Sequence, residues 1–70
     1  MSTVRATVER FDDHRGDGMA LGEDGQSYYF HCVEIADGTR TVAVGAKVIG
    51  VRRPGRLGFD ELAELQSVDG

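Results

Sequence analysis

Two short stretches of this chain carry side chains that can stack on flat ligands or supply positive charge. Residues 15–19 (RGDGM) set a basic group beside two glycines, and residues 28–32 (YYFHC) place three rings next to a histidine and a cysteine. Rings and basic groups on an open sheet surface are what hold unpaired nucleic-acid bases and their backbone. The two stretches therefore indicate a binding surface.

A catalytic centre has little support in the sequence. No serine or cysteine has a base partner at a known spacing, no Gly-Lys-Ser/Thr loop is present to hold phosphates, and 70 residues are too few to enclose a water-excluded pocket. His14, His31 and Cys32 lack the paired spacing of a zinc site. We expect no enzyme, no cofactor, no metal and no small-molecule substrate.

Length and composition indicate one globular domain spanning residues 1–70. The chain is 40% hydrophobic and 29% charged, which separates it from disordered and membrane-spanning sequences. Its first residues contain no apolar run of the kind that export requires, and its single cysteine cannot form an internal disulfide. The expectation is a cytoplasmic protein with no membrane partner.

The formal net charge of −4 argues against a protein that binds duplex DNA mainly by neutralising phosphates. The positive charges are nevertheless gathered in two places, one near the start of the chain and one around Pro54. A local basic rim on an acidic body is therefore expected, made of Arg10, Arg15, Arg52, Arg53 and Arg56.

Ten glycines and one proline divide the chain into short segments of strand length. Apolar and polar residues alternate over residues 4–11, as in a half-buried strand. Further strands are predicted at 18–21, 27–33 and 42–51, with a turn at 22–25 and loops at 37–39 and 52–58.

The segment from Phe59 to Leu65 could form an amphipathic helical turn, but we favour a fifth strand. Five short strands in so few residues are best closed into a small antiparallel barrel, because closure removes exposed edges and buries the one apolar face available. The predicted fold class is thus all-β.

In this order the segments resemble the cold-shock domain family over residues 6–68. Residues 9–12 (ERFD) match the family's Lys-Trp-Phe-Asn, and residues 15–20 (RGDGMA) match its Lys-Gly-Phe-Gly-Phe-Ile. Residues 27–35 (SYYFHCVEI) match its Asp-Val-Phe-Val-His-Phe and the residues that follow, and residues 39–42 match its Phe-Lys-Thr-Leu. The resemblance implies a five-stranded antiparallel OB-fold barrel with its binding surface on the outer face of the first strands.

Strand alternation places Tyr29 and His31 on one face and Tyr28 and Phe30 on the other, and the resemblance puts the first pair outside. Several rings usual in the family are replaced, most severely by Asp17, whose charge repels phosphate. The resemblance implies these nucleic-acid-binding residues: Arg10, Phe11, Arg15, Met19, Tyr29, His31, Arg40, Arg52, Arg53 and Arg56.

Two functions follow from this surface. The first is weak binding of single-stranded RNA or DNA, in the role of an RNA chaperone or a regulator of transcription or translation. The second is a diverged domain whose face contacts a protein partner through a mixed apolar and charged patch that includes Asp17 and Met19. Asp17 is the residue that separates the two hypotheses.

Overall fold

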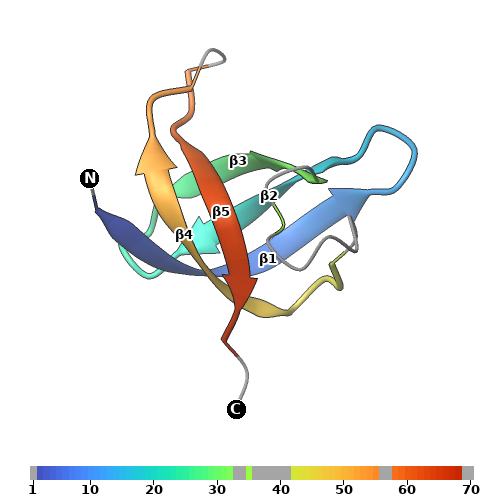
Figure 1. The fold of residues 1–70 in the computed structure, drawn as a ribbon, viewed down its shortest axis with the longest axis horizontal. Coiled ribbons are helices and arrows are strands. Elements are labelled where there is room, and N and C mark those ends of the chain that lie inside the picture. Colours follow the sequence, from blue (N-terminus) through green and yellow to red (C-terminus); the bar gives the residue numbers. More distant parts are fainter. Residues whose placement is uncertain (1, 33–34, 36–41, 56–57, 69–70) are drawn as a thin grey trace.

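A computed structural model describes residues 2–32, 35, 42–55 and 58–68, and within these residues the strands close into a barrel (Figure 1). Around the barrel the strands follow the order β1-β2-β3-β5-β4. The predicted all-β, five-stranded barrel is confirmed. Its strands are β1 (Thr3–Asp12), β2 (Asp17–Gly22), β3 (Ser27–His31), β4 (Lys47–Arg53) and β5 (Glu61–Ser67).

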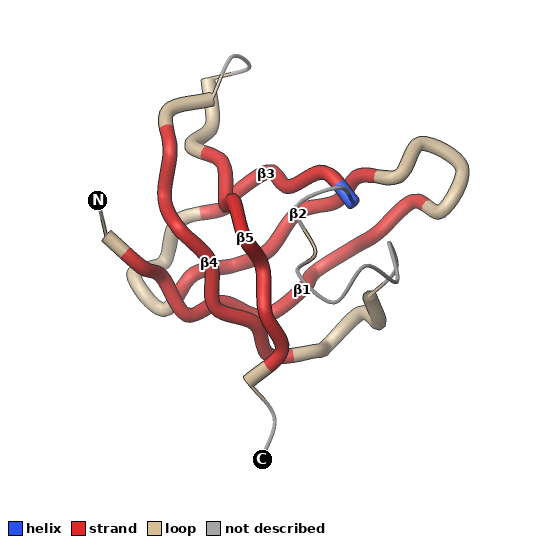
Figure 2. Tube along the Cα trace, in the orientation of Figure 1, coloured by secondary structure: helices blue, strands red, loops and turns tan. Residues whose placement is uncertain are grey.

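Antiparallel pairing joins β1 to β2, β2 to β3, β1 to β4, and β4 to β5. The barrel is closed by a parallel contact between β3 and β5, at Tyr29 and Glu61 (Figure 2). The strands are thus of mixed orientation, as in an OB-fold-like barrel. No helix in the described ranges has the length and apolar character needed to cross a bilayer.

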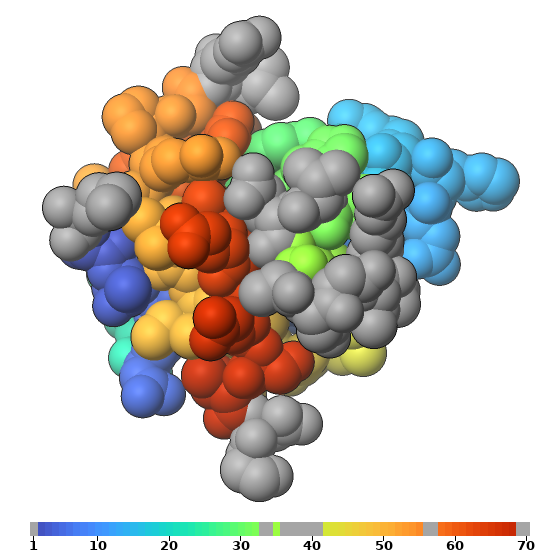
Figure 3. All heavy atoms as spheres, in the orientation of Figure 1, coloured from blue at the N-terminus to red at the C-terminus, as the bar shows by residue number. Residues whose placement is uncertain are grey.

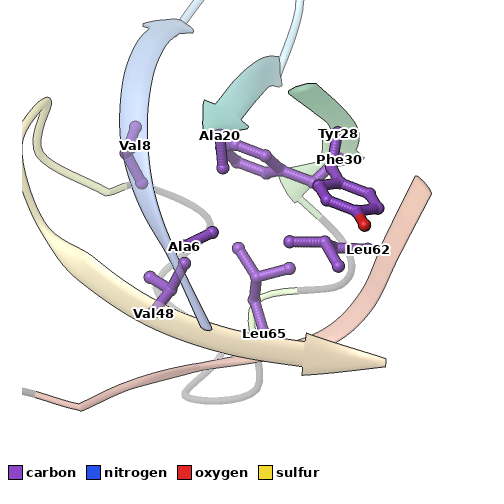
Figure 4. Packing of buried hydrophobic residues seen from close by; sticks show 8 residues of the cluster. All are labelled: Ala6, Val8, Ala20, Tyr28, Phe30, Val48, Leu62 and Leu65. Carbon is purple, nitrogen blue, oxygen red and sulfur yellow. The ribbon is translucent and has the colours of Figure 1, made fainter. Parts of the chain in front are cut away.

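The interior is filled by residues of all five strands, which alternate along β1 and β3 (Figure 4). The largest side chains come from β3, where Tyr28 and Phe30 are fully buried and face Leu62 and Leu65 of β5. Ala20 of β2 is also fully buried, and its small side chain leaves room for these rings. The predicted inward direction of Tyr28 and Phe30 is therefore confirmed.

The fourth strand differs from its predicted bounds. It begins at Lys47 rather than at residue 42, because a turn at residues 43–46 with a positive φ of 91° at Gly45 interrupts the valine-rich segment. It also continues through Arg52 and Arg53, which were predicted to lie in a loop. Both arginines pair with β5, and the strand ends at Pro54, which has no N–H to donate.

Residues 61–67 form the fifth strand and not a helical turn. Glu64 has a positive φ of 54°, next to the point where the register between β4 and β5 shifts. This irregularity lets the consecutive residues Leu62 and Ala63 both be buried, which a regular alternation would not allow.

The buried Tyr28 has a polar end that needs a partner. Its hydroxyl donates a 2.5 Å hydrogen bond to Oδ2 of Asp24 in the β2–β3 turn, and Oδ1 of Asp24 accepts one from the backbone N–H of Gln26. The Tyr28 hydroxyl, followed by the Gln26 N–H, lowers the pKa of the Asp24 carboxyl below its ordinary value. One carboxylate thus ties the β2–β3 turn to the largest ring of the core.

Acid should weaken the hydrogen bond between Tyr28 and Asp24, and the variant Tyr28→Phe should show how much this bond contributes to stability. Because the pKa of Asp24 is lowered in the folded state, its contribution to stability is full above the unfolded value of about 3.9 and is lost as the pH falls through the folded value. We expect Tyr28→Phe to unfold more easily at neutral pH and to lose less stability between pH 5 and pH 2 than the unaltered chain. Urea unfolding followed by circular dichroism would measure both, and parallel pH profiles would contradict the assignment.

Candidate functional site

The outer face of β1, β2 and β3 carries two rows of paired side chains. Arg10, Met19 and Tyr29 are neighbours across the three strands, and Asp17 is paired with His31 in the next row. Paired residues point to the same face of a sheet. The register therefore brings five residues from three strands onto one surface.

Beside these rows lies a cleft of about 620 Å³. The cleft extends from the end of β1 across the β1–β2 turn to β3 and the segment before β5. The β1–β2 turn projects from the body of the molecule (Figure 3). Its lining comprises Arg10, Phe11, Asp12, Asp13, His14, Arg15, Asp17, Gly18, Met19, Tyr29 and Phe59. The cleft thus contains five of the predicted site residues together with Asp17.

Asp17 connects the groups at the centre of the cleft. Its Oδ2 accepts a 2.8 Å hydrogen bond from the Tyr29 hydroxyl and forms a 3.1 Å ion pair with Arg15. The Asp17 side chain is 13% exposed, whereas that of Arg15 is 70% exposed. Asp17 was expected to repel phosphate and Arg15 to attract it. Because the two side chains form an ion pair, the charge of each is partly neutralised.

Tyr29 and His31 share the outer face, as predicted, and both are half-buried between the buried residues of β3. His31 also lies beside Cys32, with Nδ1 3.8 Å from the thiol sulfur. The hydrogen bond to Asp17, more than burial, raises the pKa of the Tyr29 phenol above its ordinary value. Tyr29 is thus held at its hydroxyl while its ring lines the cleft.

Phe11 lies in a different row from Tyr29. It is paired with Gly18, which is paired with Phe30, and the rings of Phe11 and Phe30 stack with centroids 5.9 Å apart and planes within 6°. Gly18 has no side chain to separate these rings, and a Cβ there would collide with the carbonyl oxygen of Arg10. Phe11 is therefore partly a core residue, although one part of it lines the cleft.

Met19 lies on the outer face, as expected, but only 8% of it is exposed. Its neighbours on that face cover most of the thioether side chain, so it offers a ligand little area. Its main effect is to give the centre of the cleft an apolar floor.

Arg52 and Arg53 belong to a separate hollow. Arg52 and Arg53 line it with Ser2, Pro54 and Asp60, and Nε of Arg52 donates a 2.8 Å hydrogen bond to the Asp60 carboxylate. This ion pair engages Arg52 at the β4–β5 end of the barrel. Arg40 and Arg56, also predicted to bind nucleic acid, lie outside the described residues.

Phe59 is a cleft residue that the sequence did not reveal. It was grouped with the apolar residues of the last segment, yet it is 49% exposed and lines the cleft opposite the β1–β2 turn. The next residue, Asp60, accepts a 3.0 Å hydrogen bond from the backbone N–H of Tyr29, which holds this segment beside β3. The preceding residue, Gly58, has a φ of 82°. A glycine at this position of the sequence could have indicated a turn that exposes the Phe59 ring.

In the described parts of the chain, no three His, Cys, Asp or Glu side chains converge as a metal site would require. No protein-family model matches the chain, and no curated protein matches it. Function is therefore inferred from the fold and from the cleft.

The bond between Tyr29 and Asp17 can be tested by titration, because the chain has only two tyrosines. In Tyr28→Phe the remaining phenol is Tyr29, and we expect it to ionise at a higher pH than free tyrosine. Adding Asp17→Asn removes the negative charge that favours the protonated phenol, so the midpoint should fall. Ultraviolet absorbance of the phenolate reports it, with circular dichroism to show that the chain stays folded. An unchanged midpoint would mean that the bond does not form in solution.

Proposed function

We propose that this chain is a diverged cold-shock-type protein that binds single-stranded RNA or DNA weakly through the cleft. The observation that carries the proposal is that two partly exposed rings, Tyr29 and Phe59, and the guanidinium of Arg10 line one cleft on the outside of a small β-barrel. Unpaired bases present flat faces to such rings, and OB-fold barrels commonly use this arrangement.

Each component has a distinct part in binding. Tyr29 and Phe59 supply stacking surfaces, each worth about 1–3 kcal/mol per base. Arg10 is exposed and makes no ion pair with another described residue, so its guanidinium can stack on a base or contact a phosphate. Phe59 offsets some of the stacking area lost at positions where the family carries rings.

The affinity is expected to be low because charge assists little. Three carboxylates and two arginines line the cleft, and one arginine is already paired with Asp17. Binding that depends on a few stacked bases suits a protein that keeps RNA unpaired transiently, in the manner of an RNA chaperone or a regulator of transcription or translation.

Tyr29→Ala and Phe59→Ala should each weaken binding of a fluorescein-labelled single strand, by about 5- to 150-fold, since each removes one stacking ring. Fluorescence anisotropy at low salt, with a short pyrimidine-rich oligonucleotide, measures the dissociation constants. Val44→Ala is the matched control, because Val44 is apolar, 64% exposed and does not line the cleft. Absence of saturable binding by the unaltered chain, or equal losses in all three variants, would overturn the proposal.

Binding of a protein partner is the second candidate, and the balance of charge in the cleft favours it. The Arg15–Asp17 pair and the apolar floor at Met19 resemble a mixed protein-binding patch more than a phosphate-binding surface. A pull-down from nuclease-treated extract separates the candidates. A partner that is retained by the unaltered chain and lost with Phe59→Ala would support a protein interface, and an empty lane would count against it.

A further inference from the structure

One oxygen of Asp17 has no hydrogen-bond partner among the described residues. Oδ2 accepts both the Tyr29 hydroxyl and the Arg15 guanidinium, whereas Oδ1 makes no hydrogen bond with any described residue. Buried side-chain polar atoms in the described ranges all have partners, so the unpartnered Oδ1 must be reached by solvent, and Asp17 itself lines the cleft. A strong hydrogen-bond acceptor is thus available at the edge of the Tyr29 ring.

The orientation of this acceptor is fixed from two sides. The 2.8 Å bond to Tyr29 and the 3.1 Å pair with Arg15 both act on Oδ2, and the side chain is only 13% exposed. A carboxylate held in this way loses little freedom when a ligand donates to its other oxygen. It is also an acceptor only, since an ionised carboxylate has no proton to donate.

A base stacked on the Tyr29 ring would present its hydrogen-bonding edge beside this oxygen. Cytosine, adenine and guanine carry an exocyclic amino group that can donate to a carboxylate. Uracil and thymine carry a carbonyl oxygen where cytosine has its amino group, so at this position two acceptors would face each other and repel, and the ring N3–H is the only donor left on that edge. The carboxylate can therefore discriminate between bases that stack equally well.

We propose that Asp17 is a specificity-determining residue, which selects an amino-bearing base over uracil or thymine at the position stacked on Tyr29. This inference rests on the proposed function and adds to it the class of base. On this view Asp17 replaces a stacking ring with a hydrogen-bond acceptor, and Arg15 offsets the charge that the exchange introduces.

Cytosine and uracil provide the matched probes, because their rings have the same size and differ at the amino or carbonyl position. We expect the unaltered chain to bind an oligo-deoxycytidine more tightly than an oligo-deoxyuridine of equal length, on the order of tenfold, at neutral pH and low salt. Asp17→Asn should bring the ratio of the two dissociation constants close to one, because an amide can either accept or donate.

Asp24→Asn is the control variant, since Asp24 also accepts a tyrosine hydroxyl but lies in the β2–β3 turn and does not line the cleft. It should keep the preference for cytidine. Equal binding of the two oligonucleotides by the unaltered chain, or a preference that survives Asp17→Asn, would overturn the role of Asp17 and leave the proposed function standing. Absence of binding to either oligonucleotide would overturn the proposed function itself. If Asp17→Asn fails to fold, equal binding of the two oligonucleotides by the unaltered chain still overturns the role of Asp17, and Asp17→Ala provides a second test of whether an observed preference is lost.

Discussion

The strict alternation of β3 is the constraint on which the rest of the molecule depends. Its inward residues, Tyr28 and Phe30, are the largest fully buried side chains, and its outward residues are Tyr29, which lines the cleft, and His31, which does not. A shift of one residue in the pairing of this strand would exchange the two sets. The backbone pairing of β3 therefore determines both which side chains are buried and which lie on the surface. A substitution that shifted the register would disrupt the core and the outer face together.

Aspartate recurs as the partner of a tyrosine hydroxyl. Asp24 holds the buried Tyr28 at the β2–β3 turn, and Asp17 holds the half-buried Tyr29 on the outer face. At both places the bond satisfies a polar group that the sheet would otherwise leave poorly solvated. The difference lies in position, because of these two aspartates Asp17 alone lines the cleft.

Local patterns predicted most of the fold. Alternation identified the first strand, while glycine-bounded segments and the run of rings indicated the second and third. Parity placed Tyr28 and Phe30 on one face of the third strand, and the resemblance assigned that face to the interior, where the structure has it. The start of β4 and the parallel closure at Tyr29 and Glu61 depend on contacts between distant segments, which parity does not encode. For the same reason the Asp17–Tyr29 bond, which spans 12 positions, and the exposure of Phe59 could not be predicted.

Ion pairs within the protein limit how strongly its arginines can attract a negatively charged ligand. Arg15 is engaged by Asp17 and Arg52 by Asp60, so two of the cations expected to steer a nucleic-acid backbone are already neutralised by the protein. Affinity that came from phosphate contacts would fall steeply with added salt, in proportion to the number of contacts. Under the proposed function, binding in the cleft would instead depend on ring stacking and on hydrogen bonds to base edges, which salt screens little, with Arg10 the lining arginine that makes no ion pair with a described residue. Under the proposed function, the pairing of Arg15 with Asp17 therefore exchanges attraction for phosphates for contacts that can distinguish one base from another.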